Sequence, residues 1–264
     1  MKIIQTSFGE VKLKTIGKGY PIIILNGGPG LSFKYMENTF SNLVENNNLN
    51  LEFIFFNQIG IDNTNDNIKI TAESSVTLFI ELINKLDILE YDILAHSWGA
   101  YLIYASIDKK LLNNLPNKIT LLNPIPMDKI NYDLVGKRLV SRIPKNDLDS
   151  IIELTNINTI KSGEKLMSLA LPYYSGRKEN LPSIKFEYNI NNYNEIANSL
   201  DNFDFTKSLE SIIDKLIFIL GKDDYIQEDD FTLINNNIFY LEGGHFSFID
   251  DFIGFEQIIK KLYI

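Results

Sequence analysis

A serine between an apolar run and a helical pattern is the residue best suited to covalent chemistry. It lies in the segment Ala95-His96-Ser97-Trp98-Gly99. This spacing is typical of a nucleophile elbow, G-x-S-x-G, in which a tight turn between a strand and a helix holds the serine hydroxyl clear of the sheet. Alanine replaces the first glycine here and keeps that position small. An ordinary helix N-cap is the alternative for Ser97, but the partners described next favour a nucleophile.

A serine hydroxyl needs a general base, and the chain holds only two histidines, His96 and His245. Because His96 adjoins Ser97 on the tight turn, we expect its side chain to point away from the hydroxyl. His245 lies in a glycine-rich loop after the last predicted strand, which favours it as the base over a loop-packing residue. A carboxylate must then orient the imidazole. Asp223 and Asp224 follow the preceding strand, and only one of these neighbours can reach His245.

The oxygen that becomes negatively charged during acyl transfer needs preorganised N–H donors. The backbone N–H of Trp98, the residue after the serine, is one predicted donor. The second is predicted in the loop after the third strand, residues 26–30, whose sequence is NGGPG. Glycine there lets the backbone approach a substrate closely. Without the other motifs, residues 26–30 would indicate only an ordinary Gly/Pro turn.

Together these motifs resemble the proline iminopeptidase family of the α/β-hydrolase superfamily, whose triads follow the order Ser, Asp, His. The resemblance rests on NGGPG at 26–30, AHSWGA at 95–100, GKDD at 221–224 and GGHF at 243–246. It implies the α/β-hydrolase fold, no cofactor and a small peptide substrate. It also implies Asp224 as the acid, and the amides of Gly28 and Trp98 as the oxyanion hole.

The sequence departs from that family at two loops. Asn26 stands where the family has a histidine, and the loop 57–64 lacks the family's Asp, Arg and second Gly. Family peptidases bind the free amino group of the substrate with glutamates of an insertion. Glu187, in the sequence KFEY, is the candidate here, although a solvated helix face explains it as well. The other glutamates of the corresponding region are Glu153, Glu164, Glu179 and Glu195.

Strands and helices must position these loops. Predicted apolar strands occupy 21–25, 51–56, 91–95, 118–123, 216–220 and 237–241, after a hairpin of 2–6 and 10–16. Predicted helices extend to about residue 46 after the NGGPG loop, and over 71–89 with Thr71 as cap, 98–107 and 248–262. This alternation predicts an α/β fold, a mostly parallel twisted sheet with helices on both faces.

Between residues 124 and 206 only helical patterns remain. We therefore predict a core of residues 1–123 and 207–264, interrupted by a small helical cap insertion, 124–206. The insertion would lie above the carboxyl ends of the strands, where α/β folds bind ligands. Its aromatic residues are candidate pocket walls, although ordinary packing explains them as well: Tyr173, Tyr174, Phe186 and Tyr188.

Composition argues against several classes of function. The formal net charge of −9, from 34 acidic and 25 basic side chains, argues against binding nucleic acid. The lack of cysteine excludes disulfides, Cys-ligated zinc and thiol nucleophiles, and two histidines cannot form a three-imidazole metal site. No signal peptide is recognisable, and no apolar run approaches the roughly 20 residues of a membrane span. We expect a cytoplasmic protein without membrane or nucleic-acid partners, and leave its oligomeric state open.

Three functions remain open at this point. The resemblance favours a serine aminopeptidase that releases an N-terminal proline or other small residue. A carboxylesterase or other acyl hydrolase would use the same triad without an amine-binding carboxylate. A non-catalytic binding protein on the same fold is the third, since fold does not imply function. A cap carboxylate near Ser97 would favour the peptidase, and an apolar pocket would favour the esterase.

Overall fold

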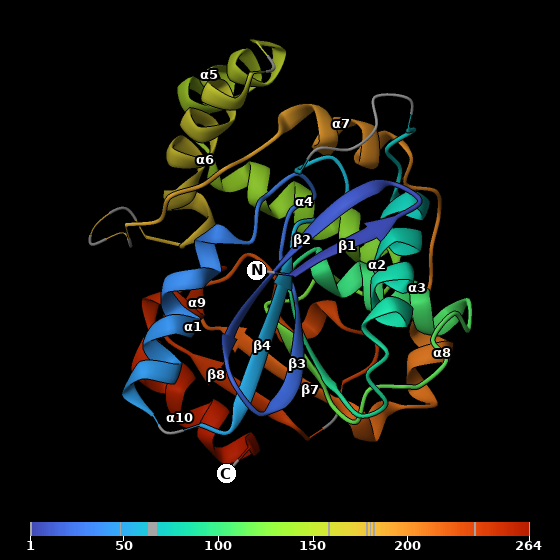
Figure 1. Ribbon diagram of the computed structural model, residues 1–264. Coiled ribbons are helices and arrows are strands. Elements are labelled where there is room, and N and C mark those ends of the chain that lie inside the picture. Colours follow the sequence, from blue (N-terminus) through green and yellow to red (C-terminus); the bar gives the residue numbers. More distant parts are fainter. Residues whose placement is uncertain are drawn as a thin grey trace.

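The computed structural model describes residues 2–47, 49–62, 68–157, 159–177, 179, 181, 183–234 and 236–263. Its strands are β1 (Lys2–Thr6), β2 (Gly9–Gly17), β3 (Tyr20–Leu25), β4 (Leu51–Phe56), β5 (Asp92–His96), β6 (Ile119–Leu122), β7 (Leu216–Gly221) and β8 (Ile238–Leu241). Within the described residues these eight strands form one sheet, in the order β1-β2-β4-β3-β5-β6-β7-β8 (Figure 1). β2 pairs antiparallel with β1 and β4, and all other neighbours are parallel. The predicted mostly parallel sheet is thus confirmed.

The central strands are continuous apolar runs because both faces of the sheet are covered. Ile22, Ile23 and Ile24 of β3 are each at most 1% exposed, and β5 is buried along its whole length. Such runs are typical of parallel strands between two layers of helices. Because β3, β5, β7 and β8 run in the same direction, the loops that follow them meet at one edge of the sheet.

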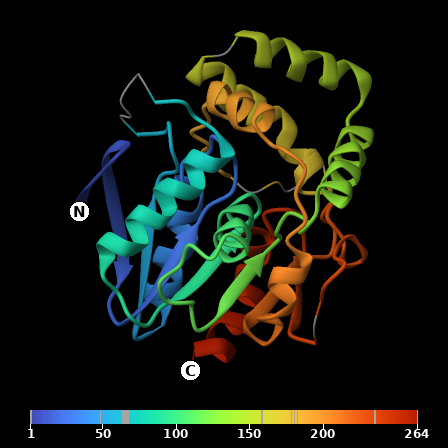
Figure 2. The same ribbon diagram turned by 90° about the vertical axis from the view of Figure 1, so that its right-hand side faces the viewer.

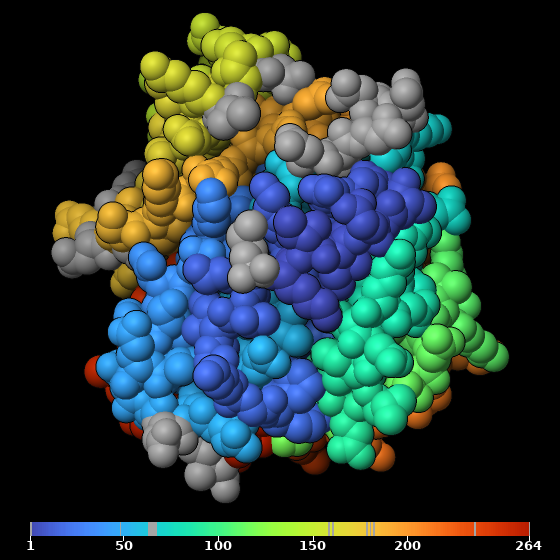
Figure 3. Space-filling view, viewed as in Figure 1, coloured from blue at the N-terminus to red at the C-terminus, as the bar shows by residue number. Residues whose placement is uncertain are grey.

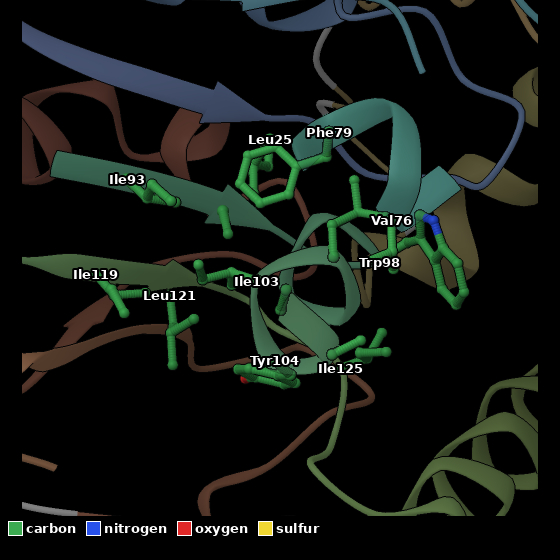
Figure 4. Packing of buried hydrophobic residues seen from close by; sticks show 14 of the residues in the cluster. Leu25, Val76, Phe79, Ile93, Trp98, Ile103, Tyr104, Ile119, Leu121 and Ile125 are labelled. Atoms are coloured by element: carbon green, nitrogen blue, oxygen red, sulfur yellow. The ribbon is translucent and has the colours of Figure 1, made fainter. Parts of the chain in front are cut away.

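Helices pack on both faces of this sheet (Figure 2). The core helices are α1 (Lys34–Asn46), α2 (Ala72–Leu86), α3 (Gly99–Asp108), α8 (Thr206–Glu210), α9 (Ser247–Asp250) and α10 (Phe252–Tyr263), with short 3-10 turns η1 (Ile213–Lys215) and η2 (Glu228–Asp230). α2, α3 and α8 contribute to one apolar cluster, and α1, α9 and α10 to the other. In the first cluster, Val76 and Phe79 of α2 and Ile103 of α3 lie near strand residues such as Leu25 and Ile93 (Figure 4).

Two helix starts show how polar side chains set helix limits. Thr71 caps α2 as predicted: its hydroxyl accepts from the Ser74 amide at 3.0 Å, and the Ser74 hydroxyl accepts from the Thr71 amide at 2.8 Å. The predicted single helix over 248–262 was wrong, because it divides at Asp251 into α9 and α10. The Asp251 carboxylate accepts from the Gly254 amide at 2.9 Å, which restarts the helix there.

The region 124–206, the predicted cap insertion, contains α4 (Lys129–Arg142), α5 (Lys145–Ile157), α6 (Ile160–Tyr174) and α7 (Ile190–Asn198). These helices lie over one end of the sheet (Figures 1 and 2), and α5 and α6 project at the top of the space-filling view (Figure 3). A β-bridge between Asp128 and Asp204 joins the two ends of the region, and another joins Tyr188 to Leu31 of the core. Among the described helices none combines the length and apolar character that a bilayer crossing requires.

Candidate active site

Ser97 occupies a strained turn directly after β5. Its backbone φ is 52°, a left-handed conformation that residues other than glycine rarely adopt. The Ser97 amide donates to the Leu122 carbonyl at 3.1 Å, and the Ser97 carbonyl accepts from the Ala100 amide at 3.0 Å. Gly99 permits the close passage of α3, because a Cβ there would lie 2.2 Å from the Leu25 carbonyl oxygen. The local geometry is therefore that of a nucleophile elbow.

Ser97, His245 and Asp224 form a continuous chain of hydrogen bonds. Ser97 Oγ is 2.8 Å from His245 Nε2, and His245 Nδ1 is 2.9 and 3.2 Å from the two carboxylate oxygens of Asp224. Because an ionised carboxylate only accepts, Nδ1 carries the proton, and Nε2 then accepts from the serine hydroxyl. His245 is 2% and Asp224 0% exposed. The exposed Asp223, the other sequence candidate, does not reach His245.

Asn123 is a part of the site that the sequence analysis missed. It follows β6 with a φ of 43°, and its Nδ2 donates to Asp224 Oδ2 at 2.8 Å. The Ser247 hydroxyl donates to Asn123 Oδ1 at 2.6 Å, which fixes the orientation of the amide. The only signal in the sequence was an Asn-Pro pair at a strand end, which indicates a turn and not a partner for an acid.

The insertion contributes directly to the position of His245. The His245 amide donates to the carbonyl of Tyr174, at the end of α6, at 2.8 Å. Gly244 makes this approach possible, because a Cβ there would lie 2.4 Å from the same carbonyl oxygen. The rings of Tyr174 and Tyr225 lie 5.6 and 5.0 Å from the imidazole, centroid to centroid. These contacts screen His245 from solvent.

The loop 26–30 places one predicted oxyanion donor beside the elbow. Asn26 Nδ2 donates to the carbonyls of Gly27 and Leu31 at 2.9 and 2.8 Å, and Gly28 has a φ of 135° that favours glycine. The Trp98 indole packs in the core cluster (Figure 4), so its backbone amide is the group available at the turn. Within the described residues neither the Gly28 nor the Trp98 amide donates to a protein acceptor. Both therefore remain available to a substrate oxygen.

A cavity of about 240 Å³ opens beside Ser97. Its lining includes Gly28, Trp98 and His245, together with apolar side chains of the insertion such as Leu139 and Met167. The polar part of the wall is mainly a group of five tyrosines: Tyr132, Tyr174, Tyr188, Tyr193 and Tyr225. Burial raises the pKa of each of these five hydroxyls, so they remain neutral. The cavity therefore offers neutral hydrogen-bonding groups among apolar surfaces.

Two of the predicted aromatic walls line this cavity and two do not. Tyr174 and Tyr188 are in the lining. Tyr173 instead donates to the Asp147 carboxylate within the insertion. Phe186 is buried, and its ring lies 5.5 Å from that of Phe246, which is itself in the lining.

Glu187, the predicted partner of a substrate amine, lies outside the cavity lining. Its carboxylate pairs with Lys34 Nζ at 2.7 Å, and the two side chains are 35% and 52% exposed. Among the described residues of the lining, Asp133 is the one acidic side chain. Asp133 is half exposed and already paired, through both oxygens, with Lys129 at 2.7 and 2.8 Å. No glutamate of the insertion lies in the described lining.

Comparisons with known proteins identify the fold. No family model matches the chain, and a search of curated proteins also finds no match. Among solved structures, the chain is similar to an esterase from Exiguobacterium antarcticum (TM-score 0.65, 16% identity, covering 99% of this chain and 98% of that one). It is also similar to a proline iminopeptidase from Mycobacterium smegmatis (0.63, 15%, 99% and 96%). An enol-lactonase from Burkholderia xenovorans LB400 is a third example (0.63, 12%, 98% and 98%). The chain therefore has the α/β-hydrolase fold; identities this low establish nothing finer.

Proposed function

We propose that this protein is a serine hydrolase that cleaves small, electrically neutral carboxylic esters. The observation that carries the proposal is the buried chain of hydrogen bonds from Asp224 through His245 to the Ser97 hydroxyl, which lies at the wall of the cavity. A hydroxyl paired with an oriented imidazole is the arrangement that activates a serine nucleophile.

The geometry supports a two-step acyl transfer. Ser97 Oγ attacks the carbonyl carbon while His245 Nε2 takes its proton, and Asp224 stabilises the imidazolium. The Gly28 and Trp98 amides bind the negatively charged oxygen. As the bond to the leaving alcohol breaks, His245 returns the proton to that oxygen. Water then attacks the acyl-enzyme by the same route, giving its proton to His245 and releasing the acid and Ser97.

The lining of the cavity supports a neutral substrate. A buried ammonium is strongly unfavourable unless a carboxylate meets it, and both acidic candidates are engaged with lysines, Glu187 outside the cavity and Asp133 at its wall. The five tyrosine hydroxyls can instead bond neutral ester or hydroxyl oxygens. The volume of about 240 Å³ restricts the bound group to a small molecule.

An aminopeptidase that releases proline or another small residue is the second candidate. The NGGPG and SWG motifs favour it, and Asp133 lies in the lining, where it could receive an amine in exchange for Lys129. Within this candidate, Asp133 replaces Glu187 as the expected partner of the amine.

A small substrate panel separates the two candidates. It contains p-nitrophenyl butyrate, and the p-nitroanilides of alanine and proline with free and with acetylated amino groups. We expect hydrolysis of the butyrate and less than a threefold effect of acetylation on kcat/KM of any anilide that is cleaved. A loss of about 10²-fold or more on acetylation, reproduced by Asp133→Asn on the free amines, would overturn the neutral-ester proposal and establish the peptidase. Ser97→Ala is the control that assigns the turnover to this site.

A further inference from the structure

Tyr35 and His96 are two buried polar side chains that the proposed reaction does not use. Tyr35, on α1, is 5% exposed, and His96, at the end of β5, is 1% exposed. The rings of Phe246 and Phe248 lie 5.2 to 6.4 Å from both of them. Placing a phenol and an imidazole among such rings is unfavourable unless their polar atoms are paired. All of these atoms are hydrogen-bonded, and the bonds that leave the pair reach loops of the proposed active site.

The direction of each hydrogen bond follows from its partner. His96 Nε2 is 2.9 Å from the carbonyl oxygen of His245, which only accepts, so Nε2 carries a proton. Burial and the neighbouring His245 hold the pKa of His96 well below its usual 6.5, so the ring is neutral and Nδ1 accepts. The Tyr35 hydroxyl donates to Nδ1 at 2.7 Å and accepts from the Gly27 amide at 2.7 Å.

The bond to Gly27 completes the restraint of the oxyanion loop. The Asn26 carbonyl accepts from Gln58 Nε2 at 2.6 Å while the Gly27 amide donates to Tyr35, so the peptide between residues 26 and 27 is held on both sides. The next peptide is held through the Gly27 carbonyl, which accepts from Asn26 Nδ2 at 2.9 Å. The Gly28 amide is the free end of that second peptide. The direction of the Gly28 N–H therefore depends on the hydrogen bonds that Gln58, Tyr35 and Asn26 make to the two peptides.

We propose that Tyr35 and His96 act as a positioning pair that keeps the oxyanion loop and the His245 loop in register. The inference rests on the proposed serine hydrolase function. One chain of hydrogen bonds links the Gly27 amide, Tyr35, His96 and the His245 carbonyl. The donor at Gly28 and the base at His245 must act on the same carbonyl group, and a fixed relation between them removes reorganisation from the reaction.

Labelling of Ser97 by a fluorophosphonate tests the pair without a known substrate. In this reaction the serine oxygen attacks phosphorus, fluoride leaves, and His245 takes the proton. Tyr35→Phe deletes one hydroxyl, and we expect it to lower the second-order rate constant of labelling by about 10-fold or more, since loss of a whole oxyanion donor costs about 10²–10³-fold.

The matched control is Tyr91→Phe. The Tyr91 hydroxyl belongs to a buried side chain and donates to the Asn114 carbonyl at 2.8 Å, away from the site. We expect this variant to label within twofold of wild type. Labelling rates are expressed per folded molecule, with the folded fraction measured by urea unfolding. A loss of stability alone then does not lower the rate. Equal rates for Tyr35→Phe and Tyr91→Phe would overturn the inference.

A second variant tests whether the pair acts as one unit. His96→Asn retains an acceptor within reach of Tyr35 and removes the donor to the His245 carbonyl. We expect it, too, to label at least about 10-fold more slowly than Tyr91→Phe, which keeps the proposal testable if Tyr35→Phe does not fold. The double variant should be at most about threefold slower than the slower single variant, and losses that multiply would contradict a single chain. If wild-type Ser97 is not labelled at all, the proposed function fails instead.

Discussion

Asp224→Asn tests how the acid loop fixes the imidazole. Asp224 Oδ2 lies 2.8 Å from Asn123 Nδ2 and 2.9 Å from His245 Nδ1, whereas Oδ1 lies 3.2 Å from Nδ1 and 3.3 Å from the Ile226 amide. An amide must place its NH₂ against donors at one of these positions. Because the contacts at the Oδ1 position are longer than those at Oδ2, the NH₂ group is less unfavourable at the Oδ1 position. The amide oxygen then takes the Oδ2 position, still accepts from Nδ1 and preserves the tautomer of His245.

The variant therefore loses mainly the charge of the carboxylate. An imidazolium and a carboxylate whose charge centres are about 4 Å apart attract each other by about 4 kcal/mol at an effective dielectric constant of about 20. That energy corresponds to about 10³-fold in kcat. A wrong tautomer would cost about 10⁴-fold. Because Asn123 orients the new amide, Asn123→Ala combined with Asp224→Asn should bring the loss to this larger value.

The assay is kcat per folded molecule on an ester that the wild type cleaves. Asp223→Asn is the matched control, since its side chain is exposed and neighbours the acid, and we expect it to stay within threefold of wild type. Asn123→Ala alone keeps the carboxylate and should cost less than about 10-fold. A slower Asp223→Asn than Asp224→Asn would refute the choice of acid. A double variant no slower than Asp224→Asn would refute the orientation argument.

Three further predictions concern the nucleophile, the buried histidine and the surface ion pair. Ser97→Ala should lower turnover by about 10⁴–10⁶-fold with little change in the free energy of unfolding, and a variant that keeps a tenth of the rate would remove Ser97 from the mechanism. Because burial and His245 depress the pKa of His96 in the folded state, the unfolded chain binds an additional proton below about pH 6.5. The free energy of unfolding should then fall with decreasing pH by up to about 1.4 kcal/mol per pH unit from this residue, and urea unfolding of His96→Asn between pH 4.5 and 6.5 should show that slope reduced. Glu187→Gln should change kcat/KM on esters and on free-amine substrates less than twofold, because the exposed pair with Lys34 lies outside the cavity lining; a 10-fold loss on the amines alone would return Glu187 to the site.

The sequence by itself determined the elements and the loops that carry the chemistry. Continuous apolar runs such as 22–24 require a sheet covered on both faces, and the structure has one. Ser97, the Asp223-Asp224 pair and His245 each follow a predicted parallel strand, and the carboxyl ends of such strands meet at one edge. Their proximity was thus expected from local patterns alone. The resemblance to proline iminopeptidases implied the α/β-hydrolase fold, which the structure has, whereas the peptidase activity stays a prediction.

Only the tertiary structure decided the partners of individual polar groups. Asn123 and Asp224 are 101 residues apart, Tyr35 and His96 are 61 apart, and no periodicity connects them. Periodicity assigns a side chain to a face of a helix or strand, but hydrogen bonds depend on how separate elements dock.

The docking of separate elements also decided which charged groups lie at the substrate cavity. The sequence offered Glu187 for an amine, but the packing of the insertion directs its carboxylate to Lys34, 153 residues away. The same packing brings tyrosines from α4, α6 and α7 around the cavity, with Asp133 paired at its wall. Local residue types indicate that a serine, a histidine and a carboxylate meet at the strand ends. Which carboxylate reaches the base, and what charge a substrate meets, depend on long-range contacts between the insertion and the sheet edge.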